Sequence, residues 1–196
     1  MFSPATEKAL RAAIEAHEGQ FRKGPEDVPY AVHPVHVALM LAGLGMDDAV
    51  VQAGILHDVV EDCHDWDLER LEEQFGRRVA RIVAELTEDK SKSWAERKQY
   101  AIDHLPQIST DAAVVKAVDK LHNLESLRTV LQAAPDPEVI WKRFHGGRDR
   151  TMEMSERLVE AVEKRVPPKI GRALRKSLES LRSVVDSQSA EATTAE

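Results

Sequence analysis

The sequence predicts an all-α fold of about eight or more helices. Apolar residues recur at spacings of three and four residues in one segment after another, which is typical of amphipathic helices. Prolines and glycines fall between these segments, where they end one helix before the next begins. No segment shows the sustained alternation of apolar and polar residues that a half-buried strand requires.

The first two helices are separated by a loop. Ser3 or Thr6 can cap a first helix that runs to about Phe21. Residues 22–29 contain two prolines and a glycine, which forbid regular structure. A second helix is expected from Val35 to Leu44, where a glycine follows.

His33 directly precedes Pro34, ahead of the second helix. Because proline restricts the backbone of the residue before it, we expect His33 to be extended rather than helical.

A central helix is predicted for residues 48–62, with Asp47 as its cap. Its first half is apolar almost all round, which is typical of a buried helix. At about 100° per residue, the charged residues of its second half share one face; these are His57, Asp58, Glu61 and Asp62. Charges that face a protein interior are costly unless they are paired or bind a metal.

The remaining chain is also predicted to be helical. Helices are expected around residues 68–75, 79–86, 94–105, 112–133, 138–144, 148–166 and 168–185, with an exposed loop at 87–93. Residues 1–186 are interpreted as a single domain that includes the amphipathic C-terminal helix 168–185. Residues 187–196 are small and polar, so they are expected to be a disordered tail.

Composition limits the classes of function. Hydrophobic residues make up 42% of the 196 residues and the net charge is −7, so no nucleic-acid or membrane partner is expected. The single cysteine, Cys63, excludes an intramolecular disulfide and favours a reducing compartment. No apolar run approaches the length of a membrane span, and the N-terminus does not resemble a secretory signal. A cytoplasmic protein is expected, and a homo-oligomer stays open.

Four residues in three segments form a candidate metal-ligand set: His33, His57, Asp58 and Asp119. Two imidazoles and two carboxylates suit Mn²⁺, Fe²⁺, Zn²⁺ or Mg²⁺. A metal-bound water becomes a nucleophile near neutral pH. Glu61 and Asp62 lie one helical turn beyond His57 and Asp58, where they can orient or deprotonate such a water.

Each of these residues also has an ordinary structural explanation. Adjacent His and Asp on a helix are usually solvated, and Asp119 beside Lys116 and Lys120 can belong to a surface ion pair. The other histidines are interpreted as structural or exposed; these are His17, His36, His64, His104 and His145.

The order His33, His57-Asp58, Asp119 resembles the HD phosphohydrolase superfamily, which implies an HD-domain helical fold. The segments 17–23, 30–34, 56–62, 75–76 and 119–123 resemble the hydrolase domain of the RelA/SpoT homologue family, and the resemblance covers residues 7–165. The segments 94–98 and 141–144 resemble its stand-alone small-hydrolase branch. No chain remains for the synthetase domain of the long family members, so only degradation is expected.

The resemblance implies one Mn²⁺, or another divalent metal, held by His33, His57, Asp58 and Asp119. It implies Glu61 and Asp62 as the catalytic pair that activates water. It further implies that Arg22 and Lys23 line a nucleotide pocket and that Asn123 contacts the ribose or base. The family reaction is hydrolysis of the 3′-pyrophosphate of guanosine alarmones such as ppGpp, and adenosine counterparts are also considered.

Two features depart from the family pattern. The loop 24–29 is longer than usual, and Cys63 stands where a threonine is usual. Two other functions stay open: a general HD-type 5′-nucleotidase, and a non-catalytic nucleotide-binding or antitoxin module. The intact Glu61-Asp62 pair argues against the second, because a pure binder does not need acids beside a metal.

Overall fold

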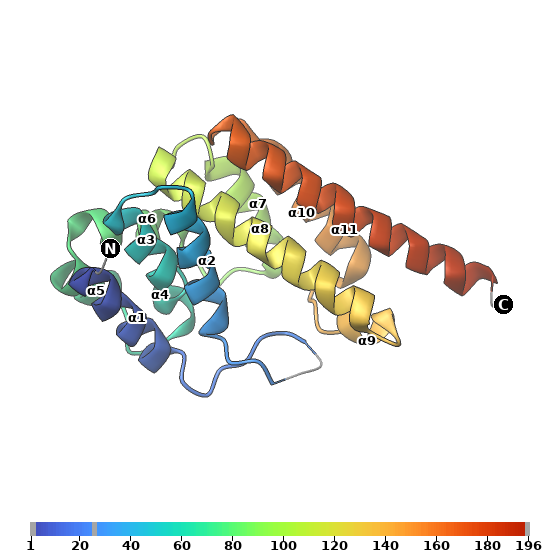
Figure 1. Ribbon diagram of the computed structural model, residues 1–196, viewed down its shortest axis with the longest axis horizontal. Helices are drawn as coiled ribbons and strands as arrows, with labels where there is room; N and C mark the ends of the chain where they lie inside the picture. Colours follow the sequence, from blue (N-terminus) through green and yellow to red (C-terminus); the bar gives the residue numbers. More distant parts are fainter. Residues whose placement is uncertain (1–2, 25–26, 195–196) are drawn as a thin grey trace.

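Helices form nearly all the regular structure in the computed structural model, which describes residues 3–24 and 27–194 (Figure 1). They are α1 (Pro4–Ala16), α2 (Val32–Gly43), α3 (Asp48–Leu56), α4 (Val59–Asp62), α5 (Leu68–Phe75), α6 (Arg77–Leu86), α7 (Trp94–His104), α8 (Thr110–Ala133), α9 (Pro137–Trp141), α10 (Gly147–Glu163) and α11 (Pro168–Thr194). Within the described ranges, extended pairing is limited to one isolated bridge between Phe21 and Pro29. The predicted all-α class is confirmed.

Side-chain caps fix where several helices begin. Asp47 accepts hydrogen bonds from the backbone N–H groups of the first turn of α3, as predicted. Ser93 and Glu96 form a reciprocal capping box at α7. The long helix α8 is capped by Ser109. The loop between α6 and α7 therefore ends at a fixed point, which matters because this loop reaches the site.

Helix α3 lies at the centre of the core. All of its residues from Val50 to Leu56 are buried, and it packs against α1, α2, α6 and α8. Gly54 permits the close crossing of α2, because a Cβ atom there would overlap the Leu41 side chain. This packing fixes the end of α3, from which the His-Asp pair follows.

The helix predicted for residues 48–62 is interrupted where the sequence turns from apolar to charged. His57 and Asp58 form a turn between α3 and α4, so the predicted helix is not continuous. The charged side chains of this segment nevertheless line one cavity, as their predicted common face required. His57 Nδ1 lies 2.9 Å from Gly54 O, where its N–H donates to that carbonyl. This hydrogen bond fixes the orientation of the imidazole ring at the end of α3.

The expectation that His33 is extended is wrong. Helix α2 begins at Val32, so His33 is helical, and its backbone N–H donates to Tyr30 O at 2.9 Å. Pro34 lies in the first turn, where its missing N–H removes no helical hydrogen bond. A helix that starts early is therefore compatible with the proline.

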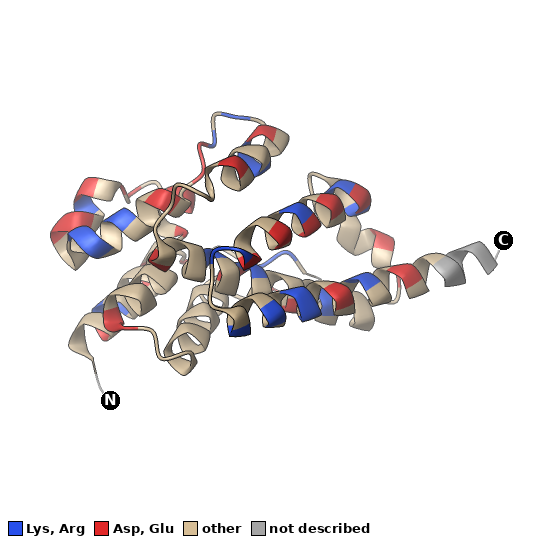
Figure 2. Ribbon diagram, turned by 90° about the horizontal axis from the view of Figure 1, so that it is seen from above, with Lys and Arg blue, Asp and Glu red and all other residues tan. Residues whose placement is uncertain are grey.

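The C-terminal helix α11 lies along α8 and beside α10 (Figure 1). Its apolar face, including Leu174, Leu178 and Leu181, is buried against the domain. Its outer face is basic in the first turns, and acidic residues appear only further along the helix (Figure 2). None of the described helices is both long and apolar enough to cross a membrane.

The tail predicted to be disordered, 187–196, is helical as far as Thr194, and its last two residues lie outside the described ranges. Gln188 Nε2 donates to Leu131 O, at the end of α8, at 2.9 Å. This contact extends the docking of α11 beyond its apolar stripe. The helix thus continues into this polar segment, where Gln188 contacts the end of α8.

Candidate metal centre and substrate pocket

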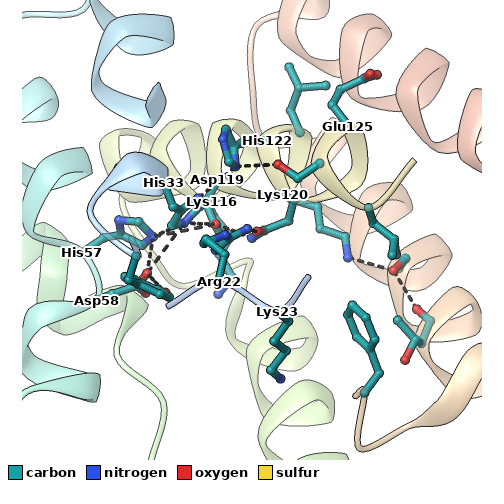
Figure 3. Close-up of a pocket in the computed structure, with 18 of the residues that line it drawn as sticks. Arg22, Lys23, His33, His57, Asp58, Lys116, Asp119, Lys120, His122 and Glu125 are labelled. Atoms are coloured by element: carbon teal, nitrogen blue, oxygen red, sulfur yellow. Dashed lines mark hydrogen bonds and ion pairs between the residues drawn. The ribbon is translucent and has the colours of Figure 1, made fainter. Parts of the chain in front are cut away.

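Four side chains from three parts of the chain meet beside α8 (Figure 3). His33 Nε2 and His57 Nε2 lie 3.3 Å apart. Asp58 Oδ2 lies 3.1 Å from His57 Nε2 and 3.6 Å from His33 Nε2. Asp119 Oδ1 completes the group at 3.2 Å from His33 Nε2 and 3.7 Å from His57 Nε2. The four residues predicted as metal ligands are thus brought together.

The two imidazoles are turned so that both Nε2 atoms face the centre. His57 Nδ1 donates a hydrogen bond to Gly54 O, so Nε2 is the nitrogen that faces the centre. His33 Nδ1 lies 2.9 Å from His122 Nδ1. Burial, followed by the nearby His33, lowers the pKa of His122 to about 3, so His122 is neutral and its Nδ1 can accept the His33 proton. Burial lowers the pKa of His57, but Asp58 and Asp119 outweigh it and hold that pKa well above its ordinary value. A bound metal would displace this proton and use the Nε2 atoms of both imidazoles.

The donor set fits a divalent metal. His33, His57 and Asp58 offer ligand atoms within 4.8 Å of one another. Neighbouring ligands of an octahedral ion, each about 2.1 Å from it, are about 3.0 Å apart, which is close to the separations found here. Burial alone would raise the pKa of Asp119, but His33 and His57 outweigh it and hold that pKa well below its usual range. The carboxylate is therefore ionised, as a ligand must be.

Two further residues orient the carboxylates. The Tyr30 hydroxyl donates to Asp58 Oδ2 at 2.6 Å. Asn123 Nδ2 donates to Asp119 Oδ1 at 2.6 Å, and Asn123 Oδ1 accepts from Arg22 at 2.8 Å. Such outer contacts fix ligand geometry. Asn123, which the resemblance implies as a contact to the ribose or base, lines the cavity and also joins Arg22 to Asp119.

Tyr30 and His122 are site residues that the sequence analysis missed. Each is three residues from a candidate ligand, Tyr30 before His33 and His122 after Asp119. His122 shares a face of α8 with Asp119, so its spacing was an available signal. Tyr30 lies in a turn before α2, where helical spacing gives no such signal.

The acidic pair of α4 lies at the edge of the site, held by the loop 87–93. Glu61 Oε2 accepts from the backbone N–H of Glu88 at 3.1 Å, and Glu61 Oε1 lies 3.6 Å from Arg97. Burial raises the pKa of Glu61 above its ordinary value. Asp62 forms an ion pair with Lys90. Both carboxylates line the same cavity as the four candidate ligands.

That cavity has a volume of about 1210 Å³ and a cationic wall. Its basic lining residues are Arg22, Lys23, Lys90, Arg97, Lys98, Lys116 and Lys120. Burial, followed by Lys98 and Arg22, lowers the pKa of Lys23. Burial lowers the pKa of Lys120 to about 8, and its Nζ donates to Ser155 Oγ at 2.8 Å. The cavity therefore combines basic side chains that a polyanion could bind with the carboxylates of the candidate metal centre.

The other histidines lie outside the candidate ligand group. His17 is buried, with its Nδ1 2.9 Å from Gln20 Oε1. His36, His64 and His145 are exposed, although His36 and His145 lie on the cavity wall. In the long loop, Gly24 O accepts a hydrogen bond from Arg143. Pro25 and Glu26 lie outside the described residues.

Comparison with known proteins gives consistent results. The HD domain family model matches residues 9–144. The chain is 47% identical over 122 residues to the zebrafish guanosine-3′,5′-bis(diphosphate) 3′-pyrophosphohydrolase MESH1, covering 61% of this chain and 67% of that protein. It is 44% identical over 123 residues to the human protein of the same name, covering 61% and 68%.

A solved structure described as a metazoan orthologue of SpoT that hydrolyses ppGpp superposes with a TM-score of 0.79 at 29% identity. The superposition covers 91% of this chain and 96% of the chain of that structure. The structure of lmo0812 from Listeria monocytogenes superposes with a TM-score of 0.67 at 30% identity, covering 76% and 99%. The chain therefore belongs to the HD domain family, in the RelA/SpoT homologue group that includes MESH1.

Proposed function

We propose that this protein hydrolyses the 3′-pyrophosphate of ppGpp, releasing pyrophosphate and leaving the 5′-diphosphate nucleoside. The observation that carries the proposal is the meeting of His33, His57, Asp58 and Asp119 at one wall of a cationic cavity. The MESH1 relatives are named for this activity. A volume of about 1210 Å³ accommodates a nucleotide with two phosphorylated positions.

His33, His57, Asp58 and Asp119 would hold a divalent metal, and we propose Mn²⁺ from the mixed nitrogen and oxygen donor set. When bound, the metal supplies Lewis-acid polarisation of a phosphoryl oxygen and a more acidic water. The hydrogen bonds from Tyr30 and Asn123 keep the two carboxylates directed at this point.

Glu61 is assigned the role of general base. Its raised pKa makes it a stronger proton acceptor than an ordinary glutamate. Asp62 is assigned a supporting role, in which it orients the attacking water. Both assignments rest on the position of the pair at the cavity wall beside Asp58.

Arg22 and Lys23 are assigned to substrate binding. Both line the cavity, and Arg22 is tied through Asn123 to Asp119. Phosphate groups held by these cations would be fixed relative to the candidate metal ligands. Such positioning lowers the entropic part of the barrier, and the positive charge stabilises the charge that develops on the leaving pyrophosphate.

The proposal extends to two properties beyond the reaction. We propose that the adenosine analogue ppApp is also a substrate, since Arg22 and Lys23 would recognise the phosphate groups, which the two nucleotides share. The buried free thiol of Cys63 supports a reducing compartment, which we propose is the cytoplasm.

The test is a product analysis with defined metals. The protein is stripped with a chelator, reloaded with Mn²⁺, Mg²⁺ or Zn²⁺, and incubated with ppGpp, ppApp and GTP. We expect pyrophosphate and GDP from ppGpp, pyrophosphate and ADP from ppApp, the fastest turnover with Mn²⁺, and intact GTP. Release of tripolyphosphate or phosphate from GTP, with ppGpp unchanged, would instead establish a general nucleotidase.

A further inference from the structure

A buried carboxylate outside the candidate metal centre organises the wall behind Glu61. Glu88 lies in the loop between α6 and α7, and its side chain is only 6% exposed. It accepts two hydrogen bonds from Lys98 Nζ, at 2.7 and 2.9 Å, and lies 3.3 Å from Arg97. Because an unpaired buried carboxylate is costly, these two cations are held close to it.

Arg97 is shared between two carboxylates. One of its terminal nitrogens, Nη1, lies 3.3 Å from Glu88 and 3.6 Å from Glu61. Its Nε is buried and has no hydrogen-bond partner within the described residues. The position of the Arg97 guanidinium therefore depends on its two ion pairs, with Glu88 and with Glu61.

Glu88 also contacts Glu61 through its backbone. Its N–H donates to Glu61 Oε2 at 3.1 Å. The backbone of Glu88 thus holds Oε2 of Glu61. The carboxylate of Glu88 competes with Oε1 of Glu61 for Arg97. If Glu88 lost its charge, Glu61 would be the remaining carboxylate for Arg97, and a more tightly paired carboxylate is a weaker base.

We propose that Glu88 is a positioning residue, which draws Arg97 away from Glu61 and holds Lys98 at the cavity wall. This inference rests on the proposed function, in which Glu61 accepts a proton and the cavity binds a phosphorylated nucleotide. Glu88 acts through Glu61, Arg97 and Lys98, and it has no contact of its own with substrate in this account.

The surroundings of Glu61 support a measurable effect on its titration. Glu61 faces Asp58 and Asp62 from its own part of the chain, and Glu88 and Arg97 from the loop and α7. Burial is the largest cause of its raised pKa, and the negative charge of Glu88 raises that pKa further. Removing the charge of Glu88 should therefore lower the pKa of Glu61.

The experiment compares Glu88→Gln with Asp89→Asn, which removes the same charge from the adjacent, exposed residue. Asp89 Oδ1 accepts hydrogen bonds from Ser91, outside the Glu61 network. The titration of Glu61 is followed by ¹³C NMR of labelled carboxyl groups in Mg²⁺-loaded protein, with Glu61→Gln used to assign the signal. Steady-state kinetics with ppGpp are measured in parallel.

In Glu88→Gln, we expect the Glu61 titration and the acid limb of kcat/KM to move to lower pH. We expect KM to rise roughly fivefold, because Lys98 loses the carboxylate that holds it at the cavity wall. Asp89→Asn should match the wild type. An unchanged Glu61 titration in Glu88→Gln would overturn the proposal.

A second variant and the NMR titration test the proposal even if Glu88→Gln does not fold or the protein has no activity. Arg97→Gln removes the cation, so the Glu61 titration should move to higher pH, and no movement would overturn the proposal even if Glu88→Gln does not fold. The NMR arm needs no turnover. A wild-type protein that left ppGpp intact would refute the proposed function, while the titrations would still decide whether Glu88 controls Glu61.

Discussion

Asn123 Nδ2 donates a hydrogen bond to Asp119 Oδ1 at 2.6 Å, one helical turn along α8. The same side chain accepts a bond from Arg22 through Oδ1, so it joins a substrate-binding candidate to a metal-ligand candidate. We predict that Asn123→Ala lowers metal affinity about 10- to 100-fold, the usual cost of losing an outer contact to a ligand.

Competition of the protein with a metal-binding dye measures this affinity. Thr129→Ala, an exposed position on the same helix, serves as the control and should bind metal normally. If Asn123→Ala keeps wild-type metal affinity and only KM rises, Asn123 is a substrate contact alone, as the family resemblance implied.

The candidate ligand Asp119 gives a prediction about stability. A metal that binds only the folded protein stabilises it by about 2.7 kcal/mol at a free concentration of 100 times Kd. We expect Mn²⁺ to raise the melting temperature of the wild type and of Asp65→Asn, an exposed carboxylate. Asp119→Asn should show no such increase in calorimetry, and an increase equal to that of the wild type would remove Asp119 from the ligand set.

The general-base role of Glu61 predicts a loss of rate without loss of metal. Glu61→Gln preserves size and the bond from the Glu88 backbone, but it cannot accept the proton. We expect kcat to fall by about 10²- to 10⁴-fold while metal content, measured by elemental analysis, stays the same. Glu69→Gln, an exposed residue of α5, should retain full activity; full activity in Glu61→Gln would show that another group accepts the proton.

The lowered pKa of Lys23 predicts weaker substrate binding at alkaline pH. Burial, followed by Lys98 and Arg22, lowers this pKa, so Lys23 loses its charge at a lower pH than a free lysine does. KM should therefore rise on the alkaline side. Lys120, with a pKa of about 8, adds its own contribution, so the informative quantity is the difference between wild type and Lys23→Arg.

An arginine at position 23 keeps its charge throughout the range. We expect the alkaline rise in KM to begin at higher pH in Lys23→Arg, and to be unchanged in Lys92→Arg, an exposed loop position. Identical alkaline profiles for Lys23→Arg and wild type would show that Lys23 does not bind the substrate.

The crossing of α2 and α3 predicts a stability effect that is independent of catalysis. A Cβ atom on Gly54 would overlap Leu41 Cδ1 in the core, and overpacking of this kind costs about 1–3 kcal/mol. Gly54→Ala should lower the free energy of unfolding by this amount in denaturant titrations. Gly43→Ala is the control, since a Cβ there meets nothing within 4 Å, and equal stabilities for the two variants would contradict the packing described.

Much of the fold followed from local patterns in the sequence. The cap at Asp47, the loop at 87–93 and the long helix near 112–133 are set by nearby residues, so they could be predicted. The break at His57-Asp58 could not, because it depends on the bond to Gly54 and on packing around α3. The hydrogen bond from Gln188 to the end of α8 likewise joins segments far apart in the sequence, so it could not be predicted.

The candidate site was likewise only partly predictable from the sequence. The four candidate ligands carry side chains whose chemistry marks them in the sequence, and the structure brings them together. Glu88 could not be found in this way, because one acid in a polar loop is ordinary until folding buries it against Arg97 and Lys98.

The most direct test of the account is a ³¹P NMR time course of Mn²⁺-reconstituted protein acting on ppGpp, quenched with chelator before each spectrum is recorded. The account predicts that the 3′-pyrophosphate signals disappear as free pyrophosphate and GDP appear in equal amounts, and that His57→Ala, which removes one candidate ligand, abolishes this change. Stable ppGpp, cleavage at the 5′-diphosphate, or wild-type turnover by His57→Ala would contradict it.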